Sequence, residues 1–565
     1  MQPRWLRPAL LLSLPVASAC RTDLPVAADP EATPSLAVAA DAAPVPVGLT
    51  DAGGRFTIDP RAGLTFRVNK ANCDIVSLVY RDLELQDQSK FSQIASGLGS
   101  TNTEVSATTS TDGTVAKVTC VTPTLTHYYV ARGGTSAIFM ATYITAEPSV
   151  GELRYIFRLA RGRVPNGNPY ADVAGNVGAV EGSDVFRMPN GETRSKFYNN
   201  PPAIDNLVHG VTGPGVGAYM IMGNRESSSG GPFFRDINNQ GVTAQQELYN
   251  YMNSGHTQTE AYRMGLHGPY ALVVTPGEAP SADLDMSWMG ALGLQGWVSD
   301  RGRVSGRVSG MRNPSAHDAV PFVVGWANAR AQYWARVDRA SGSFTSPPMI
   351  PGTYTMTLYK RELAVETSKV TVGTGTVTEH LTYVDPPEPY IFRIGEFDGT
   401  PDGFRNAEAI AYMHPSDVRM KPWGPLTYTV GESPLADFPM AQFQRAANDP
   451  TTIRFTLGPG EVRPHTLRIG VTITFAGARP VVTVNPGTPA AWTGPTPPAT
   501  KSAQPDSRGV TRGTYRGNNM LFTVDVPASA FVGGQNTIVI KSASGSSGTG
   551  FLSPSFVYDA VQLDR

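Results

Sequence analysis

The sequence predicts an all-β protein built from several sandwiches. Charged residues make up 16% of the 565 residues, well below the roughly 25% of an average chain. Glycine (58) and proline (47) are abundant, as many turns between short strands require. Hydrophobic and polar residues alternate in short runs, and no long capped amphipathic helix interrupts them in the first half of the chain. A chain of this length exceeds a single core, so we expect two to four domains.

The first 47 residues have the features of an export signal followed by a tether. Arg4 and Arg7 precede a short apolar segment at 8–17, which is too short to span a membrane. The segment ends in Val-Ala-Ser-Ala before Cys20, which resembles a bacterial lipobox and predicts lipidation of Cys20; ordinary signal peptidase cleavage near this point is the alternative. Residues 21–47 are mostly Ala, Pro, Val, Asp and Thr, which suits a flexible tether. We therefore expect a bacterial protein that is secreted or lipid-anchored on the outer surface.

Three folded units follow, each with the strand pattern of a sandwich. Residues 48–296 suit a large antiparallel β-sandwich, residues 297–386 a small fibronectin type III-like or immunoglobulin-like sandwich, and residues 387–565 a jelly roll of the carbohydrate-binding kind. Prolines at 386–389 predict a stiff linker between the last two. The proline-rich residues 480–505 predict a long surface loop. The clearest alternating strand lies in the third unit, at Leu467, Ile469, Val471, Ile473 and Phe475.

Two cysteines remain once Cys20 is set aside. Cys73 and Cys120 both lie in strand-like surroundings of the first unit. An even pair in an exported protein is expected to form a disulfide, here across a sheet. Two buried free thiols are the alternative.

The charge balance argues against a nucleic-acid partner. The formal net charge is −1, with no basic run and no acidic tail. Neutral polar partners such as carbohydrate fit this balance better.

The motif Arg154-Tyr-Ile-Phe-Arg158 predicts two guanidinium groups on one face of a strand. Such a pair can hold carboxylates in bidentate fashion and counter a developing negative charge. The alternative is that both arginines line a solvated face or pair with acidic residues. Taken alone, the motif favours that alternative.

Further candidates lie between Lys196 and His256. Tyr249 and Tyr251 share one strand face just before His256, and tyrosines in this arrangement can stack on sugar rings and hydrogen-bond to their hydroxyls. Each residue also has an ordinary structural interpretation: packed core tyrosines, a hydrogen-bonded histidine and a solvated lysine. None of these signals is specific by itself.

Several common catalytic motifs are missing from the sequence. It has no His-Glu-x-x-His metal spacing, no Gly-x-Ser-x-Gly nucleophile elbow between a strand and a helix, and no phosphate-binding loop. Asp and Glu are plentiful, so a glycosidase with paired carboxylates stays open on composition.

A set of separated motifs, in order, closely resembles the rhamnogalacturonan endolyases of polysaccharide lyase family 4. The resemblance covers most of the chain after the tether. Its motifs are Arg154-Tyr-Ile-Phe-Arg158, Ser195-Lys-Phe-Tyr198, His209-Gly-Val, Glu226 to Asp236, Tyr249-Asn-Tyr251 with His256, Gln332-Tyr-Trp334, Phe344-Thr-Ser-Pro, Pro351-Gly-Thr-Tyr-Thr355 and Ile394-Gly-Glu-Phe-Asp-Gly-Thr-Pro401.

The resemblance implies a catalytic β-sandwich, a fibronectin type III-like domain and a carbohydrate-binding jelly roll. It implies the rhamnogalacturonan I backbone of pectin as substrate, cut at the rhamnosyl-(1→4)-galacturonate bond. The family's catalytic lysine and histidine fall on Lys196 and His256. Its substrate-binding residues fall on Arg154, Arg158, Gly182, Tyr249 and Tyr251, and no distinctive motif surrounds Gly182.

These residue types suit β-elimination. The C5 proton of galacturonate is acidic only because the adjacent carboxylate can take up charge, so a cation beside that carboxylate is needed. Many uronate lyases use calcium for this purpose, whereas Arg154 and Arg158 can supply the charge without a catalytic cofactor or metal. We expect Lys196 to act as the base and His256 as the acid, although the roles could be exchanged. A lysine base must first lose its proton, which burial beside two arginines favours.

Two rival functions follow from the same residues. One is a non-catalytic glycan-binding surface lipoprotein, and the other is a lyase or hydrolase for another uronic-acid polysaccharide. Intact Lys196 and His256 argue against the first. A structural calcium ion in the third unit is compatible with the sequence, although no ligand motif marks it. A monomer is expected, with membrane attachment only through Cys20.

Overall fold

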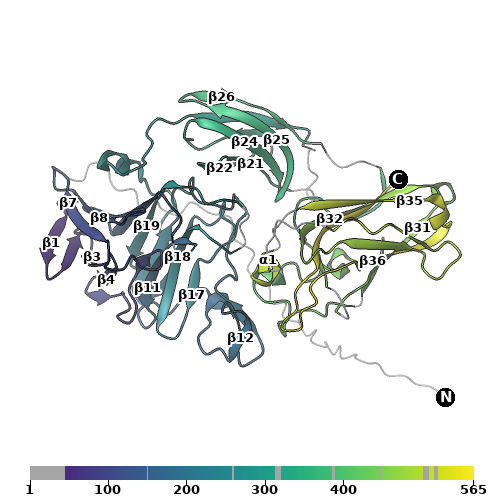
Figure 1. The fold of residues 1–565 in the computed structure, drawn as a ribbon, viewed down its shortest axis with the longest axis horizontal. Helices are drawn as coiled ribbons and strands as arrows, with labels where there is room; N and C mark the ends of the chain where they lie inside the picture. Colours follow the sequence, from purple (N-terminus) through teal and green to yellow (C-terminus); the bar gives the residue numbers. More distant parts are fainter. Residues whose placement is uncertain are drawn as a thin grey trace, which may run out of the picture.

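The computed structural model describes residues 45–148, 151–256, 260–311, 320–384, 389–424, 426–443, 447–499, 508–514 and 519–565. Cys20, the export signal and most of the tether lie outside these residues. In the described parts, regular structure is almost entirely β, and the one α-helix, α1 (Arg508–Thr511), is a single turn. None of the described helices is long and apolar enough to cross a membrane. The all-β prediction is confirmed (Figure 1).

The first unit contains four sheets. The seven-stranded sheet comprises β15 (Val208–Gly213), β16 (Val216–Ile221), β19 (Gly265–Thr275), β10 (Ala137–Ile144), β9 (Leu125–Arg132), β8 (Val115–Val121) and β7 (Glu104–Thr109) in spatial order. The five-stranded sheet comprises β1 (Gly48–Ala52), β2 (Arg55–Asp59), β3 (Leu64–Asn69), β4 (Ile75–Tyr80) and β5 (Leu83–Glu84). The four-stranded sheet comprises β17 (Asn239–Gly241), β18 (Gln245–Asn253), β11 (Leu153–Ala160) and β6 (Gln93–Ile94). The small sheet comprises β12 (Gly178–Glu181), β13 (Val185–Arg187) and β14 (Thr193–Ser195).

One hydrophobic core joins the three larger sheets, and strand alternation decides what faces it. Tyr155 and Phe157 of β11 are fully buried in this core, and the Tyr155 hydroxyl lies 2.9 Å from that of Tyr129 on β9. Because side chains of a strand alternate between its faces, Arg154 and Arg158 lie on the opposite face of β11. The core therefore fixes the strand that carries both predicted arginines.

A disulfide joins Cys73 and Cys120, as the sequence predicts. Cys73 lies in the turn between β3 and β4, and Cys120 lies on β8. Their Cα atoms are 6.0 Å apart, and both residues are buried. The bond therefore ties the five-stranded sheet to the seven-stranded one.

The second unit is a sandwich of two four-stranded sheets around buried Trp326. One sheet comprises β23 (Ser343–Thr345), β20 (Arg303–Ser309), β26 (Thr376–Thr378) and β27 (Leu381–Thr382). The other comprises β22 (Gln332–Arg336), β21 (Phe322–Ala327), β24 (Gly352–Lys360) and β25 (Leu363–Val372).

The third unit packs two five-stranded sheets around its own core. One comprises β28 (Tyr390–Gly395), β37 (Phe556–Asp564), β32 (His465–Thr474), β35 (Met520–Val526) and β30 (Ala441–Gln442). The other comprises β29 (Leu426–Thr429), β31 (Thr451–Leu457), β36 (Gly534–Ser542), β33 (Pro480–Val484) and β34 (Trp492–Thr493). The prediction of a surface loop over 480–505 was wrong for its first residues. Despite its leading proline, β33 pairs with β36 and buries Val482 and Val484.

Candidate active site

The arginine face of β11 lies beside the tyrosine face of β18. The two strands pair antiparallel, with Arg154 opposite Tyr251 and Arg158 opposite Glu247. Tyr249 and Tyr251 lie on the same face of β18, and their rings stack with centroids 5.7 Å apart. The register of one strand pair thus gathers the arginines and tyrosines that were predicted separately.

Each arginine is held by a carboxylate and by neutral acceptors. Arg154 forms an ion pair with Glu152 and donates to the Tyr251 hydroxyl at 2.9 Å and to the Ser96 hydroxyl at 3.3 Å. Arg158 donates to Glu247 at 3.1 Å and to the backbone carbonyl of Phe91 at 2.7 Å. Both arginines therefore pair with acidic residues, as the alternative interpretation of the motif expected.

The two tyrosines are largely buried, with 5% of Tyr249 and 7% of Tyr251 exposed. They pack with Ile156, Phe197 and Ile237 in a small apolar cluster. Burial raises the pKa of both phenols above the usual range, with Arg154 offsetting part of the rise at Tyr251, so both hydroxyls stay protonated at neutral pH. They form the floor of the site. The Tyr249 hydroxyl donates to Glu247, whereas the Tyr251 hydroxyl accepts from Arg154 and can still donate its own proton.

His256 lies at the end of this floor, between two carboxylates. Its Nδ1 is 3.2 Å from Asp236 and 2.8 Å from the Ser254 hydroxyl, and its Nε2 is 3.1 Å from Glu152. Its ring packs edge-on against Phe197, with centroids 5.0 Å apart. Contacts on both nitrogens fix the orientation of the imidazole, as an acid–base group requires.

Lys196 follows the last strand of the small sheet and lies, like His256, against the Phe197 ring. Val185 pairs with Ser195, so the next residues along β13 and β14, Asp184 and Lys196, also meet. Their ion pair measures 2.9 Å, and the Lys196 Nζ lies 5.8 Å from the centre of the Phe197 ring that contacts His256. Burial raises the pKa of Asp184, but Lys196, then Arg512 and His256, outweigh this effect and hold it below its usual range.

Gly182 occupies the turn between β12 and β13. It has a left-handed φ of +53°, which favours glycine, and a Cβ there would meet no atom within 4 Å. Gly182 is exposed. The same turn carries Asp184, the ion partner of Lys196, so Gly182 lies close to that pair. Its predicted role in substrate binding stays a prediction.

Glu152, Asp184 and Asp236, like the Glu247 partner of Arg158, are carboxylates of the site that the sequence did not single out. Glu152 and Asp184 carry no motif, and Asp236 was included only as the end of a longer stretch. The sequence offered no signal for the first two, since their contacts depend on strand register and on the fold of neighbouring loops. In the part of the chain that the structure describes, no three or more His, Cys, Asp and Glu residues are grouped to hold a metal ion.

His209 and Glu226, which belong to the same predicted stretch, have structural positions. Burial lowers the pKa of His209 to about 3, and its Nε2 contacts the Tyr249 carbonyl at 2.9 Å, so it braces β18 as a neutral ring. Glu226 lies at the joint with the second unit, where Arg301 binds both of its oxygens and Tyr333 donates to it at 2.7 Å. The Glu226 to Asp236 segment therefore contributes to the site only at its end.

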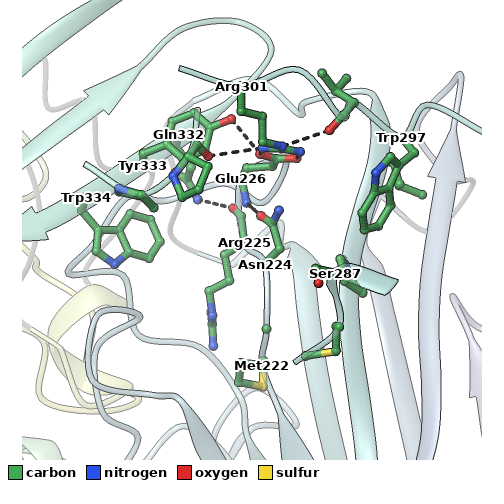
Figure 2. Close-up of a pocket in the computed structure, with 18 of the residues that line it drawn as sticks. Met222, Asn224, Arg225, Glu226, Ser287, Trp297, Arg301, Gln332, Tyr333 and Trp334 are labelled. Atoms are coloured by element: carbon green, nitrogen blue, oxygen red, sulfur yellow. Dashed lines mark hydrogen bonds and ion pairs between the residues drawn. The ribbon is translucent and has the colours of Figure 1, made fainter. Parts of the chain in front are cut away.

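Figure 2 shows that joint, which lines a cavity of about 500 Å³. Neither Lys196 nor His256 is among the residues that line this cavity. Trp297 and Trp334 flank it, and the ion pair of Glu226 with Arg301 closes one end. The candidate active site is instead the cluster around Phe197. That cluster combines a cation on a strand face, hydroxyl donors and two titratable side chains, as proton abstraction beside a carboxylate requires.

Comparison with known proteins assigns the chain to a family. Three family models match it in order. The N-terminal domain model of rhamnogalacturonan lyase B matches residues 47–296, and the models of domains II and III of polysaccharide lyase family 4 match residues 300–380 and 390–563.

Relatives align over nearly the whole chain. The chain is 50% identical to Probable rhamnogalacturonate lyase A of Aspergillus fumigatus, over 91% of this chain and 96% of that protein. It is 48% identical to Rhamnogalacturonate lyase A of Aspergillus aculeatus, over 94% and 98%, and 49% identical to Rhamnogalacturonate lyase A of Emericella nidulans, over 91% and 95%. The chain belongs to polysaccharide lyase family 4.

Proposed function

We propose that this protein cleaves the rhamnogalacturonan I backbone of pectin within the chain, by β-elimination at rhamnosyl-(1→4)-galacturonate bonds. The observation that carries the proposal is the meeting of Lys196 and His256 around Phe197, next to the Arg154 face. A lyase acting on rhamnogalacturonan agrees with the names of the family model and of the relatives.

The elimination can be written with all atoms accounted for. A base takes the C5 proton of galacturonate, the electron pair of that bond forms the C4=C5 double bond, and the bond from C4 to O4 breaks. An acid protonates O4, which leaves on the rhamnose side. The products are a 4,5-unsaturated galacturonate at the new non-reducing end and a new reducing rhamnose.

Arg154 is placed to stabilise the charge that moves onto the carboxylate. Its guanidinium, fixed by Tyr251 and Ser96, already binds one carboxylate, that of Glu152. Preorganised donors of this kind cost little reorganisation in the transition state. We propose that Arg154, supported by Arg158, makes catalysis independent of added metal, so activity should survive exhaustive chelation. Loss of activity on chelation, with recovery on adding calcium, would overturn this part.

We assign Lys196 as the base and His256 as the acid. One observation favours exchanged roles, because the ion pair with Asp184 stabilises a charged Lys196, which is the form an acid needs. A substrate with a better leaving group at C4 separates the two, since it needs the base but not the acid. The variant of the acid should regain activity on that substrate, and the variant of the base should not.

The proposal is tested by incubating the protein with rhamnogalacturonan I and with homogalacturonan. Ultraviolet absorbance reports unsaturated ends, and a reducing-sugar assay reports all cuts. We expect matched increases with rhamnogalacturonan I only, and loss of both in Lys196→Ala and His256→Ala. Reducing ends without absorbance would indicate a hydrolase, absorbance from homogalacturonan a different uronate lyase, and binding without cuts a glycan-binding protein.

Export of the protein suits a polymeric substrate outside the cell and agrees with the Cys73 to Cys120 disulfide. The relatives named above are fungal and lend no support to a bacterial lipid anchor on Cys20. Lipidation of Cys20 and the monomeric state stay predictions from the sequence.

A further inference from the structure

The third unit grips the segment that carries Lys196 from both sides. Before the lysine, Thr193 donates to Asp417 through its backbone nitrogen at 2.5 Å and through its hydroxyl at 2.6 Å. After it, the Tyr198 hydroxyl donates to the carbonyl of Thr511 at 3.0 Å. Figure 1 shows α1 at this junction of the first and third units. The backbone on either side of Lys196 is therefore anchored to the third unit.

One side chain of the third unit, that of Arg512, extends beyond these contacts and reaches the candidate active site. Arg512 follows α1, and only 6% of its side chain is exposed. Its Nη2 lies 2.6 Å from Oδ2 of Asp184, and its guanidinium carbon lies 5.0 Å from the centre of the Phe197 ring. The other oxygen of Asp184, Oδ1, holds the Lys196 ammonium at 2.9 Å. Arg512, Asp184 and Lys196 therefore form a chain of charges that ends at a predicted catalytic group.

The geometry gives each member of this chain a task. A carboxylate bound by a single flexible lysine can rotate, whereas one held from behind by a buried guanidinium has a fixed direction. Arg512 also neutralises part of the negative charge of Asp184, so the carboxylate attracts the Lys196 ammonium less strongly than it would alone. Glu181, 3.6 Å from the Arg512 Nε, offsets some of the arginine's own charge.

We propose that Arg512 is a positioning residue of the active site, supplied by the third unit, which acts on Lys196 through Asp184. The inference rests on the proposed function only in using Lys196 as an acid–base group. It means that the jelly-roll unit completes the catalytic centre, in addition to any glycan binding.

Docking of the two units alone does not account for this arrangement. Asp417, Tyr198 and the bond from the Asn199 nitrogen to the Ala411 carbonyl at 2.7 Å already join the units without touching Asp184. A residue that only joined the units would affect stability. A positioning residue must change turnover in a folded enzyme.

The test uses the full-length enzyme on rhamnogalacturonan I. We expect Arg512→Met to lower kcat by about 10- to 100-fold while KM changes less than about threefold, since small misplacement of a catalytic group costs turnover. Arg512→Lys should recover part of the loss. The matched control is Arg468→Met, which removes an arginine to aspartate pair of 2.8 Å (Arg468 to Asp564) within the third unit and should keep kcat near wild type.

A double-mutant cycle decides whether Arg512 acts through Asp184. In an Asp184→Asn background, Arg512→Met should cost less than about threefold more, because the link is already broken. Full additivity, or an unchanged kcat in folded Arg512→Met, would overturn the inference. If Arg512→Met fails to fold, Arg512→Lys in the two backgrounds answers the same question. A wild-type protein that forms no unsaturated ends would instead refute the proposed function.

Discussion

Glu152 lies between Arg154 and His256, where the proposed mechanism places the substrate carboxylate. Its carboxylate forms an ion pair with Arg154 and lies 3.1 Å from the His256 Nε2. The galacturonate carboxylate must displace it to reach the same guanidinium. Glu152→Gln keeps the shape and removes the charge, so we expect substrate to bind more tightly in this variant.

The size of the effect follows from the exposure of the pair. The Arg154 and Glu152 side chains are 21% and 18% exposed, so water screens part of their attraction. Such a pair contributes about 1 kcal/mol. Removing that competition lowers KM about fivefold. A moderate fall in kcat should accompany it, because His256 loses one of its two carboxylate neighbours.

Initial rates over a range of rhamnogalacturonan I concentrations measure both constants. Glu147→Gln is the matched control, since Glu147 is an exposed carboxylate of the same segment, and its KM should stay near wild type. An unchanged or higher KM in Glu152→Gln, with a folded protein, would show that Glu152 does not compete with substrate.

Three further predictions concern stability and binding. Replacing Cys73 and Cys120 by serine should destabilise the first unit by roughly 4 kcal/mol for a loop of 47 residues, seen as a lower thermal midpoint; an equal midpoint would contradict it. Tyr251→Phe removes one of the three acceptors of Arg154 and should lower kcat/KM about tenfold, and unchanged kinetics would argue against a role for that contact. Burial raises the pKa of Asp398 from 3.8 to about 7, partly offset by the nearby Arg361. A raised carboxyl pKa stabilises the fold at low pH, so this contribution is lost as pH rises from about 4 through 7. Asp398→Asn should make the thermal midpoint depend less on pH over that range. A pH dependence equal to that of the wild type would refute the assignment.

Local alternation was enough to predict part of the site. The Arg154 and Arg158 pattern, and that of Tyr249 and Tyr251, depend only on the period of a strand, and the structure keeps both. What alternation could not supply was the pairing of these strands in one sheet. That register depends on the core around Tyr155, whose partners lie far away in sequence.

The ion partners were harder to predict, because each belongs to a separate part of the chain. Asp184 meets Lys196 through the register of the small sheet, and Arg512 arrives from another unit more than 300 residues later. Glu226, the first residue of the Glu226 to Asp236 motif, joins the first and second units instead of lying in the candidate site. Contacts set by packing between units leave no periodic trace in the sequence.

The central claim is that Lys196 and His256 carry out an elimination, and the mass balance of the products tests it most directly. A defined rhamnogalacturonan I oligosaccharide is cleaved, and its fragments are weighed by mass spectrometry. We predict two fragments whose masses add up to that of the substrate, and no fragments with Lys196→Ala or His256→Ala. Fragments that together gain one water molecule, or wild-type yields from either variant, would contradict the account.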